Sequence, residues 1–230
     1  MKKAALIATV ALFLLIAPLS LVSAEASEMD SDWNRRIASP SYGFSFGFAE
    51  VKYGNDSKAT VVMPGIDLRH FNGTNVTEAG GFYYGYELGV AANFYLGSET
   101  LSNGASEYDI EQIAMATLFL MGKHGYRIEL PGTRGKFGIG LELGMGLMGG
   151  AGSFELKEKG GDNLSQTEEI IGPVFEAGIE GLMDAGPNNR LVLRLGLMVS
   201  PEVLDAEVYG FNAEAAPVRI NIRCGFVRDH

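Results

Sequence analysis

The sequence predicts an all-β fold, an eight-stranded antiparallel up-and-down transmembrane β-barrel preceded by a cleaved signal peptide. Three observations predict it. Long segments alternate strictly between apolar and polar residues, as from Phe82 to Leu96. The chain has 31 glycines although 47% of it is hydrophobic, an unusual pairing for a soluble domain. Its first residues have the features of a secretory signal. A barrel with an apolar exterior and a glycine-rich interior accounts for the composition.

The amino-terminal segment indicates export. Two lysines precede an uncharged run from Ala4 to Leu21, and small residues then lead to a cleavage site after Ala24. An uncleaved anchor helix is the alternative, and Pro18 near the end of the run argues against it. The expected organisation is a signal peptide at 1–24, a periplasmic tail at 25–40 and a barrel domain at 41–230.

Charge and cysteine content exclude several classes of partner. Without the signal, the chain keeps 16 basic and 28 acidic residues, a net charge of −12 that disfavours nucleic acid. Cys224 is the only cysteine, so no intramolecular disulfide forms, and it shares the parity of neighbouring apolar residues. No metal-ligand spacing occurs, and neither metal nor cofactor is expected.

The clearest strand runs from Phe82 to Leu96. Its even positions are almost all large apolar residues, whereas its odd positions are mostly Gly, Ala and a single Glu. A helix would scatter these two sets around its circumference, but a strand sends them to opposite faces. The segment exceeds the usual five or six residues of a soluble strand, and about 9–11 residues suffice for a tilted strand to cross a bilayer.

Seven further segments carry the same alternation. They start at Ser41 and continue at 59–71, 109–130, 137–148, 168–183, 190–199 and 218–226. A helix from Ile110 to Met121 is an alternative for part of the fourth strand, which is apolar on both faces. Long polar or charged loops are expected at 97–108, 151–167 and 201–216. An even strand number places both chain ends on one side, with the long loops opposite.

The direction of the two faces separates a membrane barrel from a secreted lipocalin-like carrier, which would turn its apolar face inward. The polar parity is rich in glycine and poor in lysine, which suits a narrow lumen. Arginine facing lipid near the midplane costs roughly 2–4 kcal/mol. We therefore expect a charge network in the lumen, formed by Glu87, Glu142, Glu176, Glu180, Arg194, Arg219 and Arg223. These pairs either fill space or take part in conduction.

Apolar side chains are expected to face lipid, for example Leu88, Leu143, Leu195 and Ile220. Aromatic residues near the predicted strand ends match the interfacial girdles of membrane barrels. The expected girdle consists of Tyr42, Phe82, Tyr84, Phe94, Phe137 and Phe226, with Phe71 near the same end as most of them.

These features resemble the small eight-stranded outer-membrane proteins of bacteria, the class that contains the OmpA transmembrane domain, OmpX and OmpW. The resemblance covers residues 41–228 and rests on architecture, without a family-specific motif. It implies a monomer in the bacterial outer membrane, in contact with outer-membrane lipid and with the insertion machinery. Chains of this class usually finish on an aromatic residue, whereas here four residues follow Phe226.

The predicted function is that of a non-enzymatic surface barrel with a structural or surface-interaction role, whose acidic loops face host or extracellular ligands. The alternative within this architecture is an OmpW-like conduit for small hydrophobic solutes, lined at the loop end by Met148, Phe154 and Leu156. Catalysis by a lipid-hydrolase-like barrel is disfavoured, because the chain has three histidines and no His-x-Ser pair. No catalytic residues are expected.

Overall fold

The computed structural model describes residues 35–53, 57–75, 81–95, 97, 99–130, 137–186, 189–201 and 204–229. The predicted signal peptide at 1–24 and residues 25–34 of the predicted tail lie outside these ranges. Within these ranges, no helix has the length and apolar character needed to cross a membrane.

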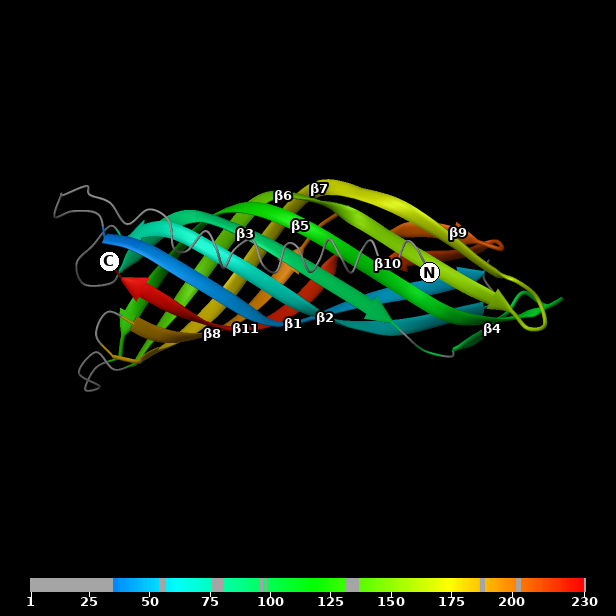
Figure 1. The fold of residues 1–230 in the computed structure, drawn as a ribbon, viewed down its shortest axis with the longest axis horizontal. Helices are drawn as coiled ribbons and strands as arrows, with labels where there is room; N and C mark the ends of the chain where they lie inside the picture. The colour runs from blue at the N-terminus through cyan, green and yellow to red at the C-terminus, as the bar shows by residue number, and fades with distance from the viewer. Residues whose placement is uncertain are drawn as a thin grey trace.

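Eight long antiparallel strands form a closed ring (Figure 1). Each strand pairs with the next, and the last pairs back with the first through contacts such as Phe44 with Ile222. In ring order the strands are β1 (Arg35–Tyr53), β2 (Ser57–Asn75), β3 (Phe82–Tyr95), β5 (Glu107–Glu129), β6 (Phe137–Glu158), β7 (Asn163–Asp184), β8 (Asn189–Val199) and β11 (Val218–Asp229). The predicted all-β fold with eight antiparallel barrel strands is confirmed.

The two ends of the ring differ. Ile37 pairs with Asp229 at the end drawn on the left of Figure 1, which we call the terminal end. The opposite end, where β1 connects to β2 and β6 to β7, is called the loop end. The connection between β6 and β7 at the loop end spans only residues 159–162, so connection length alone does not distinguish the two ends.

Several strands are longer than the sequence pattern predicts. β1 begins at Arg35, inside the segment predicted as a tail. β6 and β7 extend through most of 151–167, so the long charged loop predicted there is wrong. The helix alternative at 110–121 is also wrong, because that segment lies in β5, where the register shifts between Ile110 and Gln112.

The loop predicted at 201–216 also contains regular structure. β9 (Asp205–Val208) and β10 (Phe211–Ala215) form a hairpin, and β10 pairs with β1 from Ala49 to Lys52. Its turn residues, Tyr209 and Gly210, have positive φ angles of 53° and 78°. Two such residues fit the type I′ turn that suits the twist of a hairpin. A short strand, β4 (Thr100–Ser102), pairs with the start of β5.

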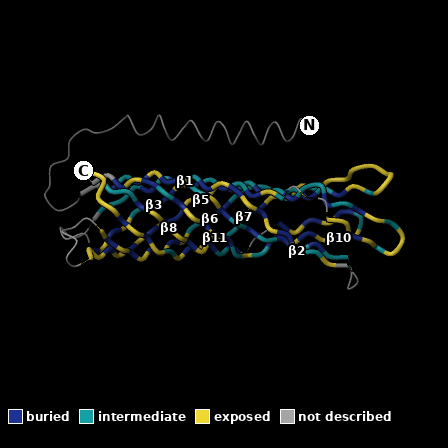
Figure 2. Tube along the Cα trace, turned by 90° about the horizontal axis from the view of Figure 1, so that it is seen from below, coloured by how far each residue is buried: buried dark blue, intermediate teal, exposed yellow. Residues whose placement is uncertain are grey.

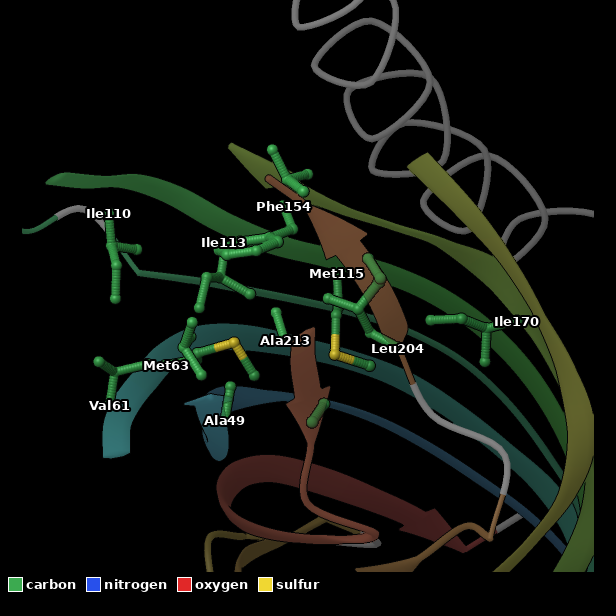
Figure 3. Packing of buried hydrophobic residues seen from close by; sticks show 14 of the residues in the cluster. Ala49, Val61, Met63, Ile110, Ile113, Met115, Phe154, Ile170, Leu204 and Ala213 are labelled. Atoms are coloured by element: carbon green, nitrogen blue, oxygen red, sulfur yellow. The ribbon is translucent and has the colours of Figure 1, made fainter. Parts of the chain in front are cut away.

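Burial alternates along the strands (Figure 2). The interior has three layers from the terminal end to the loop end. The first is a small apolar cluster that includes Ile37, Phe71 and Tyr83. The second is a set of charged side chains. The third, called here the loop-end cluster, is a larger group of buried apolar residues that includes Leu204, directly before β9, and Ala213 of β10 (Figure 3). Side chains from facing walls thus fill the ring.

Candidate functional site

The apolar parity of the strands faces outward. Leu88, Leu143 and Leu195 are 46%, 52% and 46% exposed, and Ile220 is 37% exposed. Glu87 and Arg194, on the other parity, are 1% and 2% exposed. A lipocalin-like carrier requires the reverse orientation, so that alternative is wrong. The fold is that of a closed antiparallel β-barrel with an apolar exterior and a charged interior.

The apolar exterior of this barrel ends part-way along each long strand. On β6 the outward residues are large and apolar from Phe137 to Leu147. Beyond that point the outward side chains of β6 include Ser153, Glu155 and Lys157. The apolar stretch matches the roughly 9–11 residues that a tilted strand needs to cross hydrocarbon. The rest of β6 therefore extends past the apolar band toward the loop end.

The exterior apolar band contains aromatic side chains. All six residues of the predicted girdle lie on the outside, each more than two-fifths exposed: Tyr42, Phe82, Tyr84, Phe94, Phe137 and Phe226. Phe71 was also expected there, but it is 2% exposed and packs edge-on against Tyr83 inside the ring at 5.6 Å between ring centroids. Its odd position in β2 gives it the parity of Asp67 and Arg69, which explains the inward direction.

Arg223 lies at the centre of the interior charge network. Its Nη1 donates to Glu87 Oε2 at 3.2 Å, and its Nη2 contacts Glu142 Oε1 at 3.3 Å and Glu176 Oε1 at 2.5 Å. Its Nε donates to Asn221 Oδ1 at 3.1 Å. The Arg223 side chain is fully buried. One guanidinium thus joins carboxylates from β3, β6 and β7 across the lumen.

Two further cations share these three carboxylates. Lys123 Nζ lies 3.1 Å from both Glu87 Oε1 and Glu142 Oε1 and 3.5 Å from Glu176 Oε1. Arg69 donates to Glu87 Oε1 at 2.9 Å and to Glu176. Such multiply bonded buried pairs satisfy both partners, which a buried charge needs.

Arg69 is held in place from two more directions. Its Nε and Nη2 form a bidentate pair with Asp67, both at 2.6 Å, and its guanidinium carbon lies 4.5 Å from the centre of the Phe119 ring. Stacking of a guanidinium on an aromatic face adds to its stabilisation. Neither Arg69 nor Lys123 was included in the predicted network, although both occupy interior parity.

A second group of charges lies next to the terminal-end apolar cluster. Arg127 contacts Glu180 through Nε at 2.5 Å and Nη2 at 3.2 Å, and its guanidinium lies 4.2 Å from the Tyr83 ring centre. Arg194 Nε lies 3.3 Å from Glu180 Oε2 and 3.5 Å from Glu142 Oε2, and its Nη2 donates to Ser39. Glu142 therefore connects the two groups.

Glycines on the interior face make room for these side chains. A Cβ atom added to Gly140 would lie 2.7 Å from Glu180 Oε1, and one added to Gly196 would lie 2.7 Å from Glu176 Oε1. Real Cβ atoms essentially never approach so closely. The glycine-rich parity seen in the sequence thus corresponds to the space that the carboxylates occupy.

Arg219 is the predicted network residue that lies apart from the others. It is 6% exposed, and its Nη1 donates to Thr117 Oγ1 at 3.1 Å while Nη2 lies 2.8 Å from Met148 Sδ. Among the described residues, no carboxylate lies within 4.0 Å of its guanidinium. The structure therefore brings six of the seven predicted residues into ion pairs and leaves Arg219 beside the loop-end cluster.

The mouth at the loop end is spanned by aromatic contacts. Phe211 of β10 lies 4.9 Å from Tyr53 of β1 and 5.2 Å from Tyr108 of β5, and Tyr108 lies 5.0 Å from Tyr209. β1 and β5 are separated in the ring by β2 and β3. The hairpin thus links two separate walls of the barrel across the opening.

The rim of the loop end is acidic. Among the described residues, thirteen carboxylates surround it, against four lysines: Glu50, Glu99, Glu107, Asp109, Glu111, Glu155, Glu158, Asp162, Glu168, Glu169, Asp205, Glu207 and Glu214, with Lys52, Lys58, Lys157 and Lys159. Lys159 Nζ donates to Glu107 at 2.7 Å, and this hydrogen bond and the charge of Glu107 raise the pKa of the Lys159 ammonium. Polyanions are disfavoured as ligands of such a rim.

The two described histidines lie on the outside of the ring. His70 and His124 lie on the outward parity of β2 and β5, and His124 is 6.3 Å from the Phe82 ring. His230 lies outside the described residues. No group of three or more metal-ligating side chains occurs within the described ranges.

Comparison with known proteins gives matches in structure only. No protein-family model matches the sequence, and no curated protein matches it. The solved structures that it resembles include three bacterial barrels. Ail of Yersinia pestis is 13% identical, with 84% of this chain and 98% of that chain covered and a TM-score of 0.44. OprG of Pseudomonas aeruginosa is 11% identical, with 88% and 99% covered and a TM-score of 0.49. The outer-membrane protease OmpT of Escherichia coli is 9% identical, with 90% and 100% covered and a TM-score of 0.46.

Proposed function

We propose that this chain is an integral protein of the bacterial outer membrane with a closed lumen and a non-enzymatic structural or surface-interaction role. Its apolar band contacts outer-membrane lipid, with the aromatic residues at the interfaces. The loop end then faces the outside and presents its acidic rim to extracellular or host ligands. The barrel acts as a monomer that reaches the membrane through the outer-membrane insertion machinery.

The observation that supports a closed lumen is the ion-pair network at its centre. Arg223, Lys123 and Arg69 connect carboxylates from three strands, and all of these side chains are buried. The loop-end cluster and the smaller cluster around Tyr83 fill the lumen on either side. Conduction requires a continuous path in which an ion binds weakly enough to move on, and a lumen filled in this way offers none.

Planar-bilayer recordings test this proposal. The refolded barrel is expected to give no single-channel conductance above baseline, because the central salt bridges block the lumen. A double variant, Arg223→Ala with Glu176→Ala, removes a paired cation and anion together and is the matched comparison, since it shortens two side chains at the centre. Stable single-channel steps from the wild-type protein, with the gel mobility of folded barrel, would contradict the closed lumen.

A second candidate function is a conduit for small hydrophobic solutes. The observation that favours it is the apolar lining of the loop end, where Met148, Phe154 and Leu156 are each at most 1% exposed and belong to the loop-end cluster. An apolar solute entering here would exchange contacts with water for contacts with these side chains. The central charges would stop it from crossing along the axis, so this candidate requires an exit near the membrane surface.

A further inference from the structure

Arg219 is a buried cation without a counter-charge at hydrogen-bonding distance. Its two terminal nitrogens contact only a hydroxyl and a thioether, those of Thr117 and Met148. Asp67 attracts it at longer range, but both oxygens of that carboxylate bond to Arg69 at 2.6 Å. Each of the other five buried interior cations has a carboxylate within 3.5 Å. A buried charge without a partner is costly, and a carboxylate supplied from elsewhere would reduce that cost.

The surroundings of Arg219 are apolar on the side toward the loop end. Arg219 lies opposite Met198 in the β8–β11 ladder, and a Cβ added to Gly47 would lie 3.3 Å from Met63 Cε and 3.7 Å from Arg219 Cγ. Met63, Met148 and Met198 all belong to the loop-end cluster. Their unbranched, polarizable side chains adapt to occupants of different shape. The guanidinium therefore lies against the loop-end cluster, whose methionine side chains can adapt to an occupant.

We propose that the loop-end cluster binds an amphiphile with an unbranched alkyl chain and a carboxylate head group, and that the head group pairs with Arg219. This assignment rests on the second candidate function and narrows its solute class from small hydrophobic solutes in general to fatty-acid-like anions. The alkyl chain replaces apolar side chains of the hairpin, and the carboxylate supplies the counter-charge that Arg219 lacks.

The β9–β10 hairpin provides the way in. In the described register, β9 pairs only with β10, and β7 pairs only with β6 between Asn163 and Val174. The hairpin therefore closes this side of the mouth by side-chain packing, and Leu204, directly before β9, lies against Gly152. Packing without a ladder costs less to open than paired strands do. Movement of the hairpin away from β6 would uncover the loop-end cluster.

The binding test uses native mass spectrometry of the refolded barrel with dodecanoate and with dodecanol. Wild type is expected to retain one dodecanoate and to bind dodecanol at least tenfold more weakly. Arg219→Met should lower dodecanoate affinity about 10- to 100-fold, the range for a hydrogen-bonded charge, and leave dodecanol unchanged. This variant should fold, because it removes an unpaired buried charge. Arg190→Met, at the exposed terminal end, is the control and should bind as wild type.

A disulfide lock tests the route of entry. The built Cβ of Gly152 lies 3.2 Å from Leu204 Cβ, close to the spacing of a disulfide. Gly152→Cys with Leu204→Cys, in a Cys224→Ser background, should lose dodecanoate binding when oxidised and regain it when reduced. Equal binding of both probes by wild type and Arg219→Met would overturn the role of Arg219 and leave the conduit standing. Binding of neither probe by folded wild type would overturn both.

Discussion

Replacing Arg223 with methionine is expected to lower the free energy of unfolding by about 3–5 kcal/mol, the cost of breaking a buried ion pair by removing one partner. The variant leaves Glu87 and Glu176 with only Lys123 and Arg69 to pair with, and Glu142 with Lys123 and Arg194. Three carboxylates close together in a dry lumen then repel one another. Equilibrium urea unfolding in phospholipid vesicles, followed by circular dichroism or gel mobility, measures the loss.

Arg190→Met is the matched control for this change. Arg190 also pairs with a glutamate, Glu129 at 3.3 Å, but their side chains are 29% and 46% exposed. Exposed pairs contribute only about 0–1 kcal/mol. Equal losses of stability from the two variants would show that the Arg223 network is not a buried stabilising element.

Leu143→Arg is expected to destabilise the barrel by about 2–4 kcal/mol, although Leu143 is 52% exposed. A charge in the middle of the apolar stretch of β6 would face hydrocarbon, where it is not hydrated. In a water-soluble protein the same substitution at an exposed site changes stability by less than about 0.5 kcal/mol. Urea unfolding in vesicles distinguishes the two cases.

Ser153→Arg provides the comparison on the same strand. Ser153 also points outward on β6, but it lies past the apolar stretch, toward the loop end. Its substitution should cost roughly 0–1 kcal/mol, as near a membrane interface. A large loss at Ser153 with none at Leu143 would contradict the position assigned to the apolar band.

The ring of eight strands could be predicted because each strand carries one apolar and one small or polar parity over its membrane-facing length. β3 and the first half of β6 show this most clearly, and both face as expected. The direction of the two strand faces could also be predicted. Glu142 and Arg194 lie on the glycine-rich parity and require charged partners, which lipid does not supply, so this parity faces the lumen.

The halves of the strands nearest the loop end could not be predicted, because the outward and inward positions exchange apolar and polar residues there. On β6 the apolar residues lie outward up to Leu147, and from Met148 to Leu156 they lie inward. A single rule of apolar-out therefore fails at the point where the strand leaves the hydrocarbon. The sequence around Ser153, Glu155 and Lys157 resembles a charged loop. In the structure it belongs to β6, with these polar residues outward and apolar residues facing the interior.

The missing cations of the network had a detectable signal. Lys123 and Arg127 occupy odd positions of β5, as Met121 does. After the register shift near Glu111, the odd positions of this strand face inward. Sequence alone could not show that these side chains meet Glu176 and Glu180 on a strand more than fifty residues away. The β9–β10 hairpin was less visible, because tyrosine is not a typical residue for the left-handed turn position that Tyr209 occupies.

The outward direction of the apolar face is tested most directly by a single-tryptophan measurement. Leu143→Trp in a Trp33→Phe background leaves one tryptophan, since the chain has one natively. In vesicles its emission should be blue-shifted, quenched by brominated acyl chains and unaffected by aqueous iodide. Emission at the wavelength of hydrated indole, quenched by iodide and indifferent to brominated lipid, would contradict the membrane-spanning barrel.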